Sequence, residues 1–292
     1  MKIGFIGFGE AAFCICSGLH QEGVEGIMAY DTLATHETMG SAVRQRAEQA
    51  GVVLCESVAT VAEQADMLFA AVPSSYTLDV CKTVLPYLRP GQIYADVSAS
   101  TPKTKKEIWA LIEKTGVLFT DAAMLGSLPQ DKHRVPITAS GNGATAFYKA
   151  MTPYGMRITC VEGGAGAASA IKLVRSIYMK GMAALMVEML SAADVFGVTD
   201  AVVNSISKSM DGISFTDHLK RLVTGTAIHA KRRAAELKGS IQMLDECGID
   251  DAMTVASKHK HELMEEYHLN EKYLMSKPSG YDEIIAQMRK KA

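Results

Sequence analysis

The sequence predicts an α/β fold: a Rossmann-type, doubly wound sheet followed by an all-helical C-terminal domain. Two observations support this prediction. Short apolar segments alternate with helical stretches up to residue 121, which is typical of a parallel sheet. After residue 163 the periodicity is helical and no apolar run is typical of a strand. With 292 residues, the chain has room for two domains, which we place at 1–163 and 164–292.

The expected elements follow in chain order. The first strand spans residues 2–7 and is followed directly by a glycine turn and a helical stretch from 11 to 19. Further strands are expected where short apolar segments are bounded by turn residues, at 26–30, 51–55, 66–72, 91–96, 116–121, 135–140 and 156–161. Thr101-Pro102 begins a helix, because proline is well suited to a first helical turn. The proline-free segment 165–196 predicts one helix of about 30 residues.

Composition excludes several classes of function. Thirty Lys and Arg residues against 32 Asp and Glu residues give a formal net charge of −2, which argues against nucleic acid as a partner. No apolar run reaches the roughly 18–20 residues that a membrane span needs. The six cysteines are scattered, which is typical of buried, reduced thiols in a cytoplasmic protein. We expect no metal site, because no His, Cys, Asp or Glu group has the spacing of metal ligands.

A dinucleotide-binding fingerprint follows the first strand. Gly7-Phe8-Gly9-Glu10-Ala11-Ala12 has the G-x-G-x-x-G/A pattern, with alanine at the third small position. Gly7 permits the tight turn, and Gly9 lets backbone amides approach a pyrophosphate. The N-terminus of the following helix then faces the phosphates. We therefore expect residues Gly7, Phe8, Gly9, Glu10 and Ala11 to bind a nicotinamide dinucleotide.

Asp31 ends the second expected strand, about 20 residues after Gly9, where a carboxylate can bind the ribose hydroxyls of adenosine. Such a carboxylate repels a 2′-phosphate and so favours NAD over NADP. An alternative is that Asp31 only caps a turn. NADP also stays open, because an alanine at the third small position is common among NADP users and His36 and Arg44 follow nearby.

Two further strand ends point to the same site. Val72-Pro73 and Ser98 follow the fourth and fifth strands, and ligands of open α/β sheets lie beyond the carboxyl ends of strands. These residues are predicted to contact the cofactor, with ordinary turn chemistry as the alternative.

Three segments resemble, in order and spacing, the β-hydroxyacid dehydrogenase superfamily, which includes 3-hydroxyisobutyrate and 6-phosphogluconate dehydrogenases. Residues 3–9 are similar to its opening, 121–127 to its substrate loop, and 166–172 to the segment with its catalytic lysine. Segments 176–181 and 229–236 look like a less characterised, phosphogluconate-dehydrogenase-like branch. The chain departs from the usual pattern at Leu125, Ser127 and Ser176, which stand in place of Ser, Gly and Asn, and at Ala235-Glu236, which stands in place of a Lys-Asp pair.

The resemblance implies an NAD(P)-dependent oxidoreductase that transfers a hydride between nicotinamide and a small hydroxy acid, phosphorylated or not, with or without decarboxylation. Lys172 would be the general acid or base, although its apolar surroundings alone suggest a lysine that reaches out to solvent. Substrate would be bound by Ser98, Gly126, Ser127, Ser176, Lys180, Arg232 and Arg233. For Lys180 and the two arginines, the alternative is a solvated charge, with Arg232 paired to Glu236 four residues on.

Partners and rival functions follow from the same residues. The resemblance implies a homodimer with a small anionic substrate, without nucleic acid or membrane. One rival is imine or amine reduction on the same scaffold. Another is a non-catalytic, NAD-binding redox sensor, which is suggested by the altered substrate loop and by Ser176.

Overall fold

The computed structural model describes residues 1–291 and divides into two compact units, Met1–Ile177 and the residues from Tyr178 onward. The predicted boundary at 163/164 lies just after the last strand. The boundary between the two compact units lies fourteen residues later, after Ile177 and inside a helix. The difference has a physical reason, because the first turn of that helix is hydrogen-bonded to the sheet.

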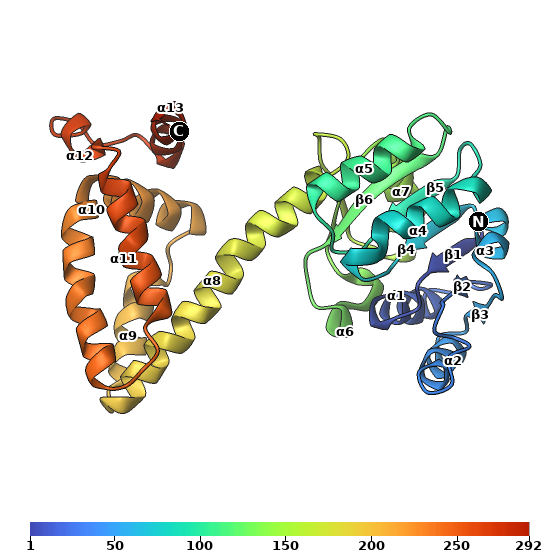
Figure 1. Ribbon diagram of the computed structural model, residues 1–292, viewed down its shortest axis with the longest axis horizontal. Coiled ribbons are helices and arrows are strands. Elements are labelled where there is room, and N and C mark those ends of the chain that lie inside the picture. The colour runs from blue at the N-terminus through green and yellow to red at the C-terminus, as the bar shows by residue number, and fades with distance from the viewer. Residues whose placement is uncertain (292) are drawn as a thin grey trace. The chain divides into compact units, whose positions relative to one another are not determined.

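The first unit is built on one eight-stranded sheet with the order β3-β2-β1-β4-β5-β6-β7-β8 (Figure 1). All eight predicted strands are present: β1 (Ile3–Ile6), β2 (Met28–Tyr30), β3 (Val53–Leu54), β4 (Met67–Ala70), β5 (Ile93–Asp96), β6 (Leu118–Met124), β7 (Ile137–Ser140) and β8 (Ile158–Cys160). Neighbouring strands are parallel except β6 and β7, which are antiparallel. The connection from β6 to β7 holds only short helical turns, and parallel strands need a longer crossover.

Helices cover both faces of this sheet, as a doubly wound fold requires. One core contains side chains of α1 (Glu10–Gln21), α2 (Gly40–Gln49) and α7 (Ala144–Met151). The other contains side chains of α3 (Val58–Gln64), α4 (Thr77–Val84) and α5 (Pro102–Ile112). The remaining turns are α6 (Leu128–Asp131), η1 (Ser74–Tyr76), η2 (Leu85–Tyr87), η3 (Lys132–Arg134) and η4 (Thr152–Tyr154).

The strand register places one row of residues across the carboxyl edge of the parallel strands. Ile6 pairs with Ala70, Ala70 with Asp96, and Asp96 with Asp121. Strand β6 continues beyond this row to Met124, where it still pairs with β7. The loops that follow β1, β4 and β5 therefore begin at one level of the sheet.

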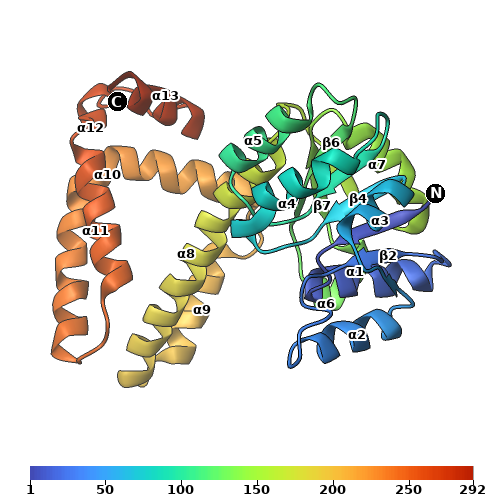
Figure 2. The same ribbon diagram turned by 45° about the vertical axis from the view of Figure 1, so that its right-hand side comes forward.

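The C-terminal part is helical, as predicted. The long helix α8 (Ala167–Val195) confirms the single helix expected at 165–196, and three glycines with positive φ, at 163, 164 and 166, precede it. The helices after it are α9 (Thr199–Met210), α10 (Phe215–Glu246), α11 (Ala252–Glu265), α12 (Leu269–Lys272) and α13 (Tyr281–Lys291). Helix α10 is kinked at His229, whose φ of −114° and ψ of 20° are not helical, and Figure 2 shows the bend.

A buried carboxylate fixes the start of α11 within this second unit. Glu188 of α8 accepts hydrogen bonds from the backbone N–H groups of Met253 and Thr254, at 2.7 and 2.9 Å. These amides belong to the first turn of α11, where backbone donors have no partner inside the helix. A side chain distant in sequence therefore caps this helix.

Two further findings concern the composition. Among residues 1–291, no helix is long and apolar enough to cross a membrane. All six cysteines are free thiols, but they are not all buried as predicted: Cys160 is exposed, and Cys55 and Cys247 are half-buried.

Candidate functional site

The loop after β1 combines one crowded glycine with one open glycine. Gly7 has a φ of 86°, and a Cβ there would lie 2.5 Å from the carbonyl oxygen of Ala71, so only glycine fits. Gly9 precedes α1, and nothing lies within 4 Å of a Cβ added to it. The loop therefore presents an open backbone surface at the N-terminus of α1, which suits a phosphate group.

A cavity of about 500 Å³ lies beside this loop, at the carboxyl ends of β1, β2 and β4. Four predicted cofactor residues line it together: Gly7, Asp31, Val72 and Pro73. Tyr76 also lines the cavity and was not anticipated, because its position depends on the short turn η1. The cavity and the open loop fit a dinucleotide.

Asp31 holds the glycine loop as well as facing the cavity. Its Oδ2 atom accepts a hydrogen bond from the backbone N–H of Phe8 at 2.6 Å, and its Oδ1 atom accepts one from Leu33 at 2.8 Å. Asp31 thus caps the turn, as the alternative from the sequence proposed. Each carboxylate oxygen still has a second lone pair that can accept a hydrogen bond from a ligand. Arg44 instead donates to the carbonyl of Ala34, and neither Arg44 nor His36 lines the cavity.

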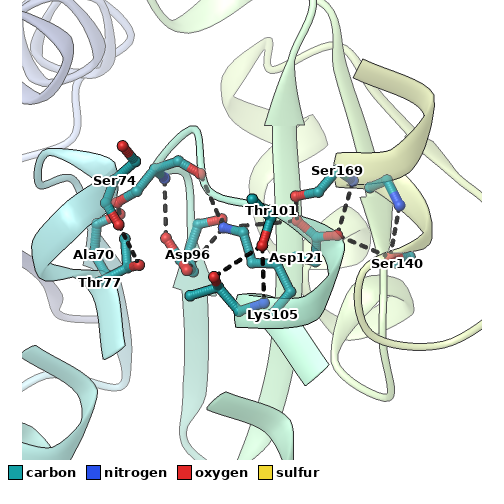
Figure 3. A network of polar contacts seen from close by, with 12 residues as sticks. Ala70, Ser74, Thr77, Asp96, Thr101, Lys105, Asp121, Ser140 and Ser169 are labelled. Atoms are coloured by element: carbon teal, nitrogen blue, oxygen red, sulfur yellow. Dashed lines mark hydrogen bonds and ion pairs between the residues drawn. The ribbon is translucent and has the colours of Figure 1, made fainter. Parts of the chain in front are cut away.

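A buried ionic network lies where β5 ends beside β6 (Figure 3). The side chain of Lys105 on α5 is 0% exposed, and its Nζ atom lies 2.7 Å from Oδ2 of Asp96 and 3.7 Å from Oδ1 of Asp121. The ammonium group also donates to the backbone carbonyls of Asp96 and Ser98, at 3.1 and 2.9 Å. We did not predict this network from the sequence.

Ser98 is buried, and its hydroxyl group bonds to the backbone of the adjacent strand end. It donates to the carbonyl of Ala70 at 3.2 Å and accepts from the N–H of Val72 at 3.1 Å. This geometry gives Ser98 a part in holding the loop after β4, next to the cavity wall at Val72.

The candidate catalytic lysine lies on the part of α8 that belongs to the first unit. Lys172 and Ser176 are half-buried, one helical turn apart. Lys180 is exposed and lies on the second unit's part of the same helix. The structure therefore places Lys172 and Ser176 with the nucleotide-binding loop in one unit and assigns Lys180 to the other.

The predicted substrate loop lies at the end of β6. Gly126 and Ser127 are exposed there, before α6. His133 further along this connection is buried, and burial lowers its pKa. Arg134 donates to Glu22 at 2.5 Å, and Glu22 follows the last residue of α1. This bond therefore anchors the connection between β6 and β7 to the C-terminal end of α1.

The two predicted anion-binding arginines belong to the second unit and have protein partners there. Arg232 is 2.7 Å from Glu236, which is the helical pair that we considered as the alternative. Arg233 donates to Oγ1 of Thr226 at 2.5 Å across the kink in α10. Within residues 1–291, no group of three or more His, Cys, Asp or Glu side chains is arranged to hold a metal ion.

Comparisons with known proteins agree with this geometry. Residues 2–163, more than half of the chain, match the family described as the NAD binding domain of 6-phosphogluconate dehydrogenase. Residues 193–264 match a domain of unknown function, DUF1932. The matched segments confirm the resemblance predicted from the sequence.

Individual relatives cover most of the chain. An uncharacterised 28.5 kDa protein of Methanothermus fervidus is 29% identical over 81% of this chain and 88% of its own length. A solved structure of a conserved protein of unknown function, described as similar to 3-hydroxyacid dehydrogenases, is 31% identical, covers 92% of this chain and 99% of its own, and has a TM-score of 0.62. A reductive aminase of Aspergillus terreus in complex with NADPH shares the fold, with a TM-score of 0.72 at 14% identity over 89% of this chain and 92% of its own.

Substitution of the open glycine separates binding from folding. Gly9→Ala should leave the unfolding midpoint unchanged, because the added Cβ meets no atom, yet weaken NADH binding about tenfold or more by blocking the backbone surface. Fluorescence titration with NADH and thermal unfolding measure the two effects. The matched control is Gly181→Ala, which also meets open space but lies on α8. Equal NADH affinity for Gly9→Ala and the unaltered protein would contradict this assignment.

Proposed function

Because the chain belongs to the family of the NAD binding domain of 6-phosphogluconate dehydrogenase, we propose that it is a nicotinamide-dependent dehydrogenase of small, anionic hydroxy acids. The observation that carries the proposal is the position of Lys172. It lies three residues after Ser169, whose hydroxyl and N–H bond to Asp121 at the carboxyl edge of the sheet. This is the edge from which the Gly7–Gly9 loop also starts.

The proposed reaction assigns one role to each group. A nicotinamide cofactor bound beside the Gly7–Gly9 loop would supply the acceptor for the hydride of the carbinol C–H bond. The amine of Lys172 accepts the hydroxyl proton as the carbonyl forms, and it returns a proton in the reverse direction. Ser176 orients the substrate hydroxyl, while the backbone and hydroxyl of Gly126-Ser127 hold the substrate carboxylate. A β-keto acid product can then lose CO₂.

Replacement of the lysine tests this role. Lys172→Met removes the amine and keeps an unbranched side chain of nearly the same length, so kcat should fall about 100-fold or more while NADH affinity stays within about twofold. The assay follows NADH absorbance with a panel of β-keto and β-hydroxy acids. Lys103→Met is the control, because Lys103 is an exposed lysine at the start of α5.

Two outcomes would contradict the proposal. A kcat within about threefold of the unaltered protein would exclude Lys172 as the general acid or base. NADH binding without turnover of any acid in the panel would instead support the redox-sensor alternative.

We propose NAD as the preferred cofactor. Asp31 lines the cavity, and its carboxylate would lie against the 2′-phosphate of NADP, where two negative charges repel each other. The neighbouring cations give NADP little support, because Arg44 is engaged with the backbone and is not part of the cavity wall.

A substitution that removes the charge, together with the acceptor for the N–H of Leu33, tests the cofactor preference. Asp31→Asn retains one oxygen that can accept from Phe8, so the glycine loop should keep its shape. The ratio of kcat/KM for NAD to that for NADP should fall about tenfold or more. Asp79→Asn, an exposed change on α4, should leave the ratio unaltered. An unchanged ratio in Asp31→Asn would show that the carboxylate does not select the cofactor.

We also propose that a second copy of the chain covers an apolar surface of the second unit. Twelve large apolar residues of α8, α9, α10 and their connections are exposed there: Leu185, Met186, Val187, Leu190, Val195, Phe196, Val198, Val203, Ile206, Ile213, Phe215 and Leu222. Their exposed area is on the order of 1,000 Å², against the roughly 800 Å² that each partner buries in a standard interface.

Charge placed on this surface should prevent association. Val195→Lys is expected to convert a dimer into a monomer, measured by light scattering after size-exclusion chromatography, because a lysine would be buried without a partner. Val53→Lys is the matched control, since both valines are 58% exposed and Val53 lies on β3 of the first unit. A monomeric unaltered protein, or a dimeric Val195→Lys variant, would contradict the proposed interface.

Finally, we propose that the protein works in the cytoplasm. All six cysteines are free thiols, and Cys160 is exposed to solvent. Thiols persist in reducing compartments, whereas secreted proteins tend to form disulfides.

A further inference from the structure

The first turn of α8 is capped by side chains from the sheet. The N–H of Ala168 donates to Oγ of Ser140 at 3.0 Å, and the N–H of Ser169 donates to Oδ2 of Asp121 at 2.9 Å. The hydroxyl of Ser169 adds a 2.7 Å bond to Oδ1 of the same carboxylate. These backbone donors have no partner within the helix, so β6 and β7 supply the missing acceptors.

Asp121 is itself fixed from the opposite side. Lys105 places its ammonium group 3.7 Å from Oδ1 of Asp121, and Lys105, Asp121 and Asp96 are all fully buried. Asp96 accepts from the N–H of Ser98 at 2.9 Å. Figure 3 shows the contacts from Asp96 through Lys105 and Asp121 to Ser169. Because Ser98 also accepts from the N–H of Val72, a continuous chain of polar contacts runs from the cavity wall to α8.

This chain of contacts ends close to the candidate catalytic group. Lys172 follows Ser169 by three residues, which is about 4.5 Å along a helix axis. Helical backbone is stiff over one turn, so a change in the anchoring at Ser169 changes where the Lys172 backbone lies. Ser169 and Asp121 are both buried, so we assign neither of them a direct contact with the substrate.

We propose that Asp121, held by Lys105, is a positioning residue for Lys172 and links its placement to the cofactor-side loop at Val72. This inference deepens the proposed function and rests on it for the role of Lys172 in catalysis. The anchoring itself rests on the observed contacts alone. Asp121 acts through Ser169 and takes no part in the proton transfer.

Ser169→Ala is the decisive variant, because it removes one bond to Asp121 and keeps the backbone N–H bond. We expect hydrogen exchange of the amides at 167–171 to quicken about tenfold, as expected for the loss of a bond to a charged group. The rate of acylation of Lys172 by an N-hydroxysuccinimide ester, followed by mass spectrometry, should change at least about threefold. Ser191→Ala is the matched control on the same helix, since the Ser191 hydroxyl bonds to the carbonyl of Val187 within that helix.

Kinetics add a measurement that a purely structural role would not alter. With an acid that the unaltered protein turns over, Ser169→Ala should lower kcat about tenfold and leave the KM for NADH within about twofold. A second variant, Asp121→Asn, keeps the volume of the side chain but only one of the two acceptor oxygens, so it should show the same pattern more strongly.

The outcomes separate the two proposals. Unchanged exchange and unchanged Lys172 acylation in both variants would overturn the positioning role, and so would faster exchange with an unchanged kcat. If the unaltered protein turned over no acid, the proposed function would fail. The acylation rates would then still decide whether Asp121 sets the position of Lys172.

Discussion

The structure depends on the burial of one ammonium group between two carboxylates. Lys105 is completely enclosed, and a charge in that position is tolerated only when it is paired and hydrogen-bonded. Its partners, Asp96 and Asp121, stand opposite each other on neighbouring strands. Lys105 therefore links α5 to the end of β5 and to the middle of β6, and, through Asp121 and Ser169, to the start of the long helix α8.

The candidate site follows from this arrangement at the carboxyl edge. The register sets the loops after β1, β4 and β5 at one level, so the glycine loop, the cavity wall at Val72 and the buried triad are neighbours along the edge. Asp31 supports the glycine loop from β2 in the way that Asp121 supports α8 from β6. Glu188 likewise accepts from a backbone N–H group in the first turn of α11. Carboxylates distant in sequence fix backbone amides at each of these points.

The strands and the position of the cavity could be predicted from the sequence, because both depend on local patterns of residues. Apolar runs bounded by turn residues identified all eight strands, and the spacing of Gly7, Gly9 and Asp31 identified the cavity. The antiparallel β6–β7 pair was not distinguished, because strand direction depends on the length and path of the connection. The kink at His229 could not be predicted, because no proline lies there. The hydrogen bond from Arg233 to Thr226 spans this kink, so it was missed as well.

Lys105 illustrates why the remainder was missed. It lies among Lys103 and Lys106, and nothing local shows which of the three is buried. A signal did exist: the segments expected as strands at 91–96 and 116–121 both end in aspartate, and two buried carboxylates require a cation nearby. That signal becomes readable only when the strand register is known, because the register brings the two residues side by side.

The most direct test is a double-mutant cycle in the free energy of unfolding, using Lys105→Met, Asp121→Asn and the double variant. If the buried pair holds this edge together, the single changes should not add, and the coupling should be on the order of 1–3 kcal/mol. Additive effects within about 0.5 kcal/mol would show that Lys105 and Asp121 act independently. That result would contradict the central claim that one buried ammonium group organises the site.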